Sequence, residues 1–207
     1  MFLSQGLMLY DVVWQAEKEP LLTVLQKKKR LRWAMEHKDW HLNQWAEVIF
    51  SLDESKFEVA VRDTRMRVLR TKSEAFHEDS FSHTVKFPAS VMVWGCIGRR
   101  GPGKLHLVNG TINALAYQGI LETNLLPSIP MLRGEGEVIF QQDGATCHTA
   151  RTTRRWLEEH SVPVLQEWSP SSPDFNPIES VWHKMKKRLR QQRPRSLGAL
   201  RTKLPLV

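Results

Sequence analysis

The sequence predicts an α/β protein built on one mixed sheet, in which an antiparallel meander is followed by parallel strands with helical crossovers. Two observations predict this class. Between residues 47 and 108 the chain alternates short runs rich in β-branched residues with charged or turn-forming ones, which is typical of antiparallel strands. After residue 137, apolar and amphipathic runs follow in the order strand, helix, strand, helix, which is typical of parallel strands joined by helices.

The first half of the chain is expected to form a basic helix and then the meander. Residues 21–40 follow Pro20 with good helix formers and apolar positions at helical spacing. Strands are then predicted at VIF (48–50), FEVAV (57–61), MRVLR (66–70), SVMVWGCI (90–97) and KLHLV (104–108). The run at 90–97 is apolar on both faces and is expected to be central. The turn-like RRGPG after it predicts a hairpin.

The second half is expected to supply helices and parallel strands. Residues 113–127 have leucines at helical intervals and predict a helix that covers the sheet. The sequence then predicts a strand at 138–143, a helix at 149–160, a strand at 162–165 and a helix from Pro177. A meander followed by this alternation is the element order of ribonuclease-H-like folds.

Composition and charge restrict the class of protein. We expect one main domain at residues 41–195, preceded by a basic helical segment at 1–40 and followed by a short C-terminal tail at 196–207. The 30 Lys and Arg against 22 Asp and Glu give a net charge of +8, which favours a polyanionic partner, with nucleic acid first. A hydrophobic content of 41% excludes wholesale disorder. No run approaches the roughly 18 apolar residues that span a bilayer, so no membrane association is expected.

Two acidic residues follow predicted strands. Asp143 ends the apolar run VIF, and in open α/β sheets ligands bind beyond the carboxyl ends of strands. An Asp that hydrogen-bonds the next turn through its own side chain is the alternative interpretation. Asp53 follows VIFSL in the same way, although a hairpin corner also accommodates an acid for solubility alone.

A third acid, Glu179, lies at the start of a predicted helix. Asn176 suits the N-cap, Pro177 the first helical position and Glu179 the third, which is a capping-box arrangement and a complete structural explanation. The same residue falls at the margin of the apolar stripe of that helix, so it can face the end of a sheet. Asp174 competes for any role given to Glu179.

Bringing three carboxylates together is physically reasonable only with cations. Like charges about 4 Å apart repel by roughly 4 kcal/mol at an effective dielectric of 20. Hard oxygen ligands with room for water suit Mg²⁺ or Mn²⁺. A pair of such ions favours in-line displacement at phosphorus.

Four stretches carry a family resemblance: VIFSLDESKF (48–57), SVMVWGCIGRRGPGKLHLVNG (90–110), VIFQQDGATCHTA (138–150) and WSPSSPDFNPIESVWHKMKKRL (168–189). Together they resemble the catalytic domain of Tc/mariner superfamily DDE transposases, over about residues 28–195. The resemblance implies a ribonuclease-H-like core in which Asp53, Asp143 and Glu179 are the catalytic acids and hold two Mg²⁺ or Mn²⁺ ions.

That resemblance also implies an activity, partners and a location. The expected activity is cut-and-paste DNA transposition, that is, strand cleavage and strand transfer on double-stranded DNA in the nucleus, with a homodimer left open. The alternatives are a transposon-derived nucleic-acid-binding protein that has lost catalysis and a simple nuclease acting on RNA–DNA hybrids. Residues 1–40 are expected to be a remnant of, or linker from, the family's N-terminal DNA-binding region.

At one position the sequence departs from the family pattern. The pattern joins the serine directly to the first acid, whereas here Leu52 separates Ser51 from Asp53. One extra residue in a strand turns all that follows to the opposite face unless a bulge absorbs it.

Basic residues after Glu179 predict a DNA contact. The stretch 184–203 contains no acid, and an acid-free run in a basic protein favours phosphate binding over a merely solvated face. The residues we assign to DNA are Lys184, Lys186, Lys187, Arg188, Arg190 and Arg193.

His148 is expected to line the active cleft, whereas a zinc site with Cys147 and His160 has the wrong spacing. The run 27–30 fits nuclear targeting, backbone binding or a polar helix face equally well.

Overall fold

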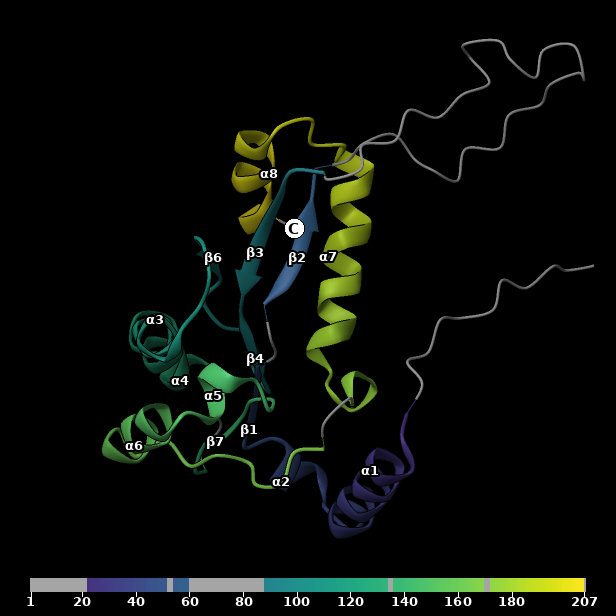
Figure 1. Cartoon of the computed structure of the whole chain (residues 1–207), viewed down its shortest axis with the longest axis vertical. Coiled ribbons are helices and arrows are strands. Elements are labelled where there is room, and N and C mark those ends of the chain that lie inside the picture. Colours follow the sequence, from purple (N-terminus) through teal and green to yellow (C-terminus); the bar gives the residue numbers. More distant parts are fainter. Residues whose placement is uncertain (1–21, 52–53, 60–87, 134–135, 170–171, 207) are drawn as a thin grey trace, which may run out of the picture.

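The computed structural model describes residues 22–51, 54–59, 88–133, 136–169 and 172–206. Short strands run through the centre of the molecule, with α3 to α6 on one side and α7 on the other (Figure 1). The predicted strand at 66–70 lies outside the described residues. No helix in the described part of the chain is both long and apolar enough to cross a membrane.

The sheet beside the candidate acids has four strands in the order β5-β4-β1-β7. Their bounds are Val48–Ser51 for β1, Cys96–Gly98 for β4, Gly101–Pro102 for β5 and Ile139–Gln141 for β7. β1 pairs antiparallel with β4 and parallel with β7, and a parallel bridge joins Phe140 to Val164 at the edge. The predicted change from antiparallel meander to parallel strands is confirmed for β7, whereas the strand predicted at 162–165 is reduced to a single bridge at Val164.

A second sheet continues the first one and has the order β2-β3-β6. Its strands are Ser55–Glu58 (β2), Ser90–Trp94 (β3) and His106–Val108 (β6), all antiparallel. The run 90–97, predicted as one strand, is thus divided at Gly95. A Cβ at Gly95 would lie 2.9 Å from the Trp182 ring, so glycine allows α7 to approach the sheet closely at this break.

The register of the two sheets differs by one residue. Ser51 pairs with Cys96, and Ser55 pairs with Val93, so the pairing shifts by one residue between β1–β4 and β2–β3. Ile49 packs in one core cluster and Phe57, an even number of residues later, packs in the other. Residues of the same parity in β1 and β2 therefore face opposite sides of the sheets.

One face of the sheet is covered by helices from the middle of the chain. They are α3 (Ala114–Ile120), a π-helical turn (Leu121–Leu125), α4 (Leu126–Leu132), α5 (Thr146–Thr149) and α6 (Arg151–Glu159). Asn113 caps α3 by accepting a hydrogen bond from the Ala116 N–H at 2.9 Å. The helix predicted at 113–127 is confirmed and extends to 132, whereas the one predicted at 149–160 is divided at Ala150. Their apolar side chains bury Trp94 and Phe140 completely.

The other face is covered by α7 (Ile178–Gln192), α8 (Leu197–Lys203) and a 3₁₀ turn (Leu204–Leu206). The predicted apolar stripe of α7 is buried, with Trp182, Met185 and Leu189 packed on the β2–β3 half of the sheet. Leu200 and Leu204 complete this cluster and are 0% and 1% exposed. We expected residues 196–207 to be a tail outside the domain, but α8 is part of its core.

The N-terminal helix also packs on the domain, although we expected residues 1–40 to lie outside it. α1 (Val24–His37) and the short α2 (Leu42–Trp45) precede β1. Trp33 is 5% exposed and lies against Val48 and Leu165, and its ring is 4.9 Å from Trp168 and 5.4 Å from Phe175. The aromatic residues of α1 therefore attach this helix to the loop that precedes α7.

Candidate active site

Asp143 lies in the turn between β7 and α5, two residues after the strand ends. Its Oδ1 accepts a hydrogen bond from the Ala145 N–H at 3.0 Å, so the turn-forming role that we considered as an alternative is present. The same oxygen is 2.7 Å from Nδ1 of His148. With one quarter of its side chain exposed, at 24%, Asp143 is fixed by its own loop and still faces solvent.

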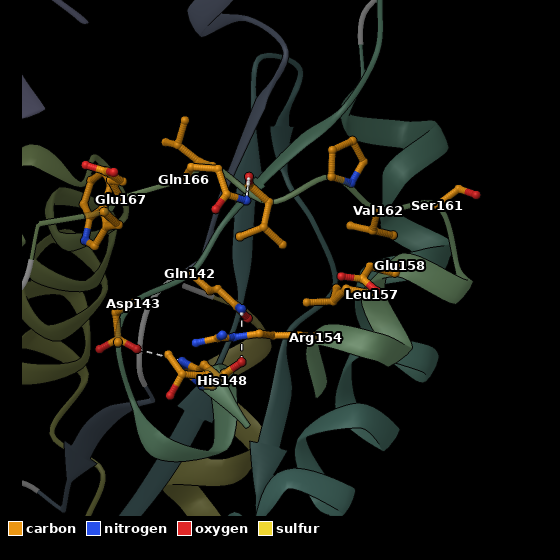
Figure 2. A pocket seen from close by; sticks show the side chains of 16 residues that line it. Gln142, Asp143, His148, Arg154, Leu157, Glu158, Ser161, Val162, Gln166 and Glu167 are labelled. Carbon is orange, nitrogen blue, oxygen red and sulfur yellow. Dashed lines mark hydrogen bonds and ion pairs between the residues drawn. The ribbon is translucent and has the colours of Figure 1, made fainter. Parts of the chain in front are cut away.

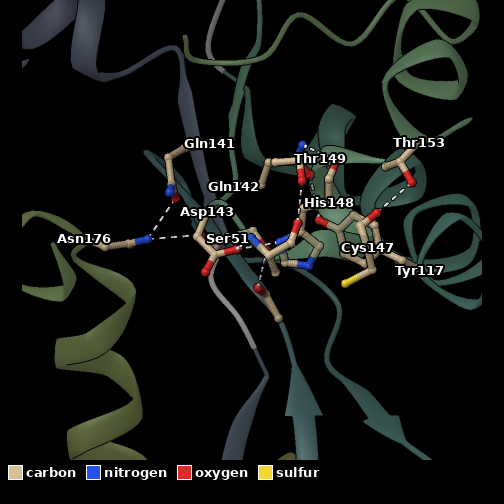
Figure 3. Close-up of polar contacts among 12 residues, drawn as sticks. Ser51, Tyr117, Gln141, Gln142, Asp143, Cys147, His148, Thr149, Thr153 and Asn176 are labelled. Carbon is tan, nitrogen blue, oxygen red and sulfur yellow. Dashed lines mark hydrogen bonds and ion pairs between the residues drawn. The ribbon is translucent and has the colours of Figure 1, made fainter. Parts of the chain in front are cut away.

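His148 belongs to a network that holds the Asp143 loop in place (Figure 3). Its ring is buried and lies 4.1 Å from the Tyr117 ring of α3. Tyr117 donates its hydroxyl proton to Gln142 Oε1 at 3.0 Å, and Gln142 Nε2 donates to the His148 carbonyl at 3.3 Å. Because Nδ1 faces a carboxylate, the tautomer that suits this contact carries its proton there and donates it to Asp143.

Glu179 is the second residue of α7 and is half-buried. The capping box predicted for this helix is not formed as expected, because α7 begins at Ile178 and Pro177 occupies the N-cap position without a side-chain hydrogen bond. Asn176 instead accepts a hydrogen bond from the Ile178 N–H at 3.1 Å. Within the described residues no hydrogen bond or ion pair of the Glu179 carboxylate is present, so its position is set by the backbone of α7.

The start of α7 is tied to the ends of two strands. Asn176 Nδ2 donates to the Ser51 carbonyl of β1 at 3.0 Å and to Gln141 Oε1 of β7 at 2.8 Å, as Figure 3 shows. The structure therefore brings together the segment that carries Asp143 and the segment that carries Glu179. Asp53 itself lies outside the described residues.

Asp174, the alternative candidate for the role of Glu179, pairs instead with Arg30 of α1. Its two carboxylate oxygens accept hydrogen bonds from Nη1 and Nη2 of Arg30 in α1 at 2.7 and 2.6 Å. Hydrogen bonding to this guanidinium lowers the pKa of Asp174 below its ordinary value of 3.8. The pair fastens α1 to the loop before α7, and the Arg30 guanidinium also lies over the Phe175 ring at 4.4 Å.

An open cavity of about 930 Å³ adjoins Asp143 (Figure 2). Its lining includes His148, Arg154 of α6 and the segment 161–168 that runs along the sheet edge. His148, which we expected to line the active cleft, thus contributes to a depression beside Asp143. His160, considered with it for zinc, instead stacks on Trp156 at 3.9 Å.

The basic residues assigned to DNA follow Glu179 along α7. Lys186 is half-buried, with its ammonium 5.4 Å from the centre of the Phe57 ring. The others are exposed: Lys184, Lys187, Arg188, Arg190 and Arg193. Lys184, Lys187 and Arg190 lie away from the buried stripe of α7, and Arg193 follows the last residue of the helix.

The carboxylates fit a hard divalent cation. Asp143 and Glu179 offer oxygen donors, the type that Mg²⁺ and Mn²⁺ prefer. Among the residues that the structure describes, no three His, Cys, Asp or Glu side chains converge on one point; the third predicted acid, Asp53, lies outside that set.

Sequence reasoning missed Asn176 and Gln141 as links between the acidic segments. It treated Asn176 only as a helix cap and gave Gln141 no role. The signal available was the pair of buried amides at the ends of two elements, since buried polar groups need partners.

Comparisons with known sequences agree with this arrangement. A family profile described as "DDE superfamily endonuclease" matches residues 48–201. "Transposable element Tcb1 transposase" of Caenorhabditis briggsae is 36% identical over 174 residues, which are 84% of this chain and 63% of that protein. "Transposable element Tc1 transposase" of Caenorhabditis elegans is 34% identical over 173 residues, 83% of this chain and 62% of that protein. The chain thus spans less than two thirds of the length of these relatives.

Solved structures with similar folds include several complexes of the Mos1 transposase. "Mos1 transposase paired-end complex with left transposon end" has a TM-score of 0.76 and 23% identity, covering 96% of this chain and 59% of that chain. Mos1 mariner paired-end complexes with Mn and with Mg each have a TM-score of 0.71 and 21% identity, covering 94% of this chain and 58% and 57% of theirs. These likenesses confirm the predicted ribonuclease-H-like fold.

Proposed function

Because the chain belongs to the DDE superfamily of endonucleases, as the catalytic domain of a Tc/mariner transposase, we propose that it cleaves DNA phosphodiester bonds and transfers the freed strand end to target DNA. The observation that carries this proposal is the junction at Asn176. There the end of β7, which precedes Asp143, meets the first turn of α7, which contains Glu179. Two carboxylates at one sheet edge suit metal-dependent phosphoryl transfer.

We propose Asp53, Asp143 and Glu179 as the ligands of Mg²⁺ or Mn²⁺. When bound, such ions supply charge neutralisation and activate the attacking oxygen. The donor set supports this assignment, as do the Mos1 mariner complexes with Mn and with Mg. The family to which the chain belongs supports the inclusion of Asp53, which lies outside the described residues.

The other residues of the site have binding and orienting roles. His148 and the Ala145 N–H hold the Asp143 carboxylate in one orientation, which lowers the entropy cost of assembling the site. The exposed cations of α7 contact the phosphates of double-stranded DNA, which fixes the position of the duplex without reading its sequence. The "left transposon end" in the Mos1 complex supports a DNA partner.

The test is Mn²⁺-dependent nicking of supercoiled plasmid by the purified chain. We expect the parent to nick and both Asp143→Asn and Glu179→Gln to lose the activity, with unchanged circular dichroism. Asp174→Asn is the matched control, because it removes a nearby carboxylate that is engaged with Arg30, and it should still nick. A folded parent that binds DNA but never nicks would contradict the proposal. It would favour the alternative, a DNA-binding protein that has lost catalysis.

Two further expectations from the sequence remain proposals. The exposed Lys27, Lys28 and Lys29 of α1 support a nuclear location, since a cluster of cations accessible to a receptor suits nuclear targeting. Replacing all three by Ala should move a fluorescent fusion from nucleus to cytoplasm.

Dimerisation is tested by light scattering with and without DNA, where a homodimer doubles the measured mass.

A further inference from the structure

The buried amide of Asn176 lies where three elements of the site meet, and it is 2% exposed. Its partners Ser51 and Gln141 end β1 and β7, and Asn176 itself comes two residues before α7 begins. Gln141 precedes Asp143 by two residues, and Asn176 precedes Glu179 by three. We propose that Asn176 is a positioning residue that sets the separation of Asp143 and Glu179. This inference rests on the proposed function, in which those two acids hold a divalent cation.

The orientation of the Asn176 amide is determined by its neighbours. Its Oδ1 accepts from the Ile178 N–H at 3.1 Å. Its Nδ2 carries two protons and faces two acceptors, the Ser51 carbonyl and Gln141 Oε1. A rotated amide would place oxygen against two oxygens and NH₂ against an N–H, so only one orientation satisfies all three contacts. Both amide protons of Asn176 are therefore committed to the ends of the two strands.

These hydrogen bonds determine the position of the first turn of α7 relative to β7, which the packing of α7 does not determine. The apolar stripe of α7 packs through Trp182 and Met185 on the β2–β3 half of the sheet. β7 belongs to the other half and pairs with β1. Apolar burial is non-directional, whereas hydrogen bonds of 2.8 and 3.0 Å fix the first turn of α7 against the strand ends. Groups that share a metal ion must be held to within about 0.5 Å.

Helix capping alone does not account for Asn176. Asn113 caps α3 through its Oδ1 in the same way, with a 2.9 Å hydrogen bond from the Ala116 N–H. Asn113 is exposed, however, and within the described residues its amide protons have no protein partner. A cap therefore needs neither burial nor donors, and Asn176 has both. Asn113 is the matched control for the capping contribution.

The experiment measures Mn²⁺ binding to the full chain without DNA, by the loss of the free-ion electron paramagnetic resonance signal. The variants are Asn176→Ala, Gln141→Leu and Asn113→Ala. We expect Asn176→Ala to weaken Mn²⁺ binding by about 10- to 100-fold, the effect of removing groups that orient ligands. Gln141→Leu keeps the cap and the contact with Ser51, so it should weaken binding by a smaller factor. Asn113→Ala should lower the melting temperature and leave Mn²⁺ affinity unchanged.

The outcomes separate this inference from the proposed function. If Asp143→Asn and Glu179→Gln bind Mn²⁺ as the parent does, the metal site itself is wrong. If those two lose affinity while a folded Asn176→Ala binds Mn²⁺ as the parent does, the site stands and the positioning role is overturned. Should Asn176→Ala fail to fold, Gln141→Leu decides the matter, because unchanged Mn²⁺ affinity in that variant also overturns the role.

Discussion

The two described acids of the site are held in place by different means. Asp143 is oriented by contacts within its own loop, from the Ala145 N–H and from His148, five residues away. Glu179 is carried on a helix whose start is fixed by Asn176 to residues 35 and 125 positions earlier in the chain. The direct contacts of Asp143 are therefore local, although His148 itself packs on Tyr117, whereas the contacts that place the start of α7 are tertiary. Changes in the two regions should have different consequences.

The largest expected effect comes from breaking the local support of Asp143. His148→Ala removes the ring that contacts Oδ1, so the carboxylate gains rotational freedom and Mn²⁺-dependent nicking should fall by about 10- to 100-fold. His148→Asn can place an amide N–H near the position of Nδ1 and should recover part of the rate. Initial nicking rates at saturating Mn²⁺ measure both effects.

The control for the His148 variants is His160→Ala. His160 follows α6 and stacks on Trp156, so its removal should leave nicking unchanged. If His148→Ala has the melting temperature of the parent and nicks at the parental rate, His148 does not orient the Asp143 carboxylate for catalysis. The proposed difference between the two acids would then be wrong.

An intermediate effect is expected along α7, away from the acids. Replacing Lys184, Lys187 and Arg190 by Ala removes exposed cations, so DNA affinity should fall. The slope of log affinity against log salt should become shallower by about 0.9 for each phosphate that is no longer neutralised. Fluorescence anisotropy of a labelled duplex at several salt concentrations gives both quantities. Arg155→Ala serves as control, because Arg155 is paired with Glu159 on α6. An equal change in slope for that variant would contradict the proposal that the cations of α7 bind the DNA.

The smallest effect is expected where α1 joins the loop before α7. The Arg30 hydrogen bonds lower the pKa of Asp174 in the folded protein below 3.8, so the pair stabilises the fold above that pH and the contribution is lost as pH falls below it. The Asp174 side chain is 56% exposed, so Asp174→Asn should cost no more than about 1 kcal/mol, or about 2 to 4 °C in melting temperature.

Urea unfolding at pH 7, 5 and 3.5 tests this linkage. The difference between parent and Asp174→Asn should be present at pH 7 and 5 and shrink at pH 3.5. Glu36→Gln, in an exposed 3.7 Å pair with Arg32, should show a smaller difference at every pH. A difference for Asp174→Asn that does not vary with pH would show that the Arg30 pair does not stabilise the attachment of α1.

The same contrast explains how much of the molecule could be predicted from the sequence. The strand before Asp143 was predictable because an apolar run followed by an acid and small residues has a local meaning. The stripe of α7 was predictable from the spacing of Trp182, Met185 and Leu189. Each of these signals is contained within one element of the chain.

Features that depend on distant partners were not predictable. Nothing near Trp33 in the sequence indicates that its ring meets Trp168 and Phe175, so α1 was assigned outside the domain. Leu200 and Leu204 lie in a short segment whose burial depends on α7. The close approach of Trp182 to Gly95 comes from another element, and the two partners of Asn176 could be found only in three dimensions.

The central claim, that these acids form a divalent-cation site, is tested most directly by a crystal structure of the chain soaked in Mn²⁺, with anomalous diffraction measured at the manganese edge. We predict an anomalous peak within bonding distance of carboxylate oxygens of both Asp143 and Glu179. A well-ordered structure that has no peak at these two residues, or whose manganese is bound elsewhere, would contradict the account.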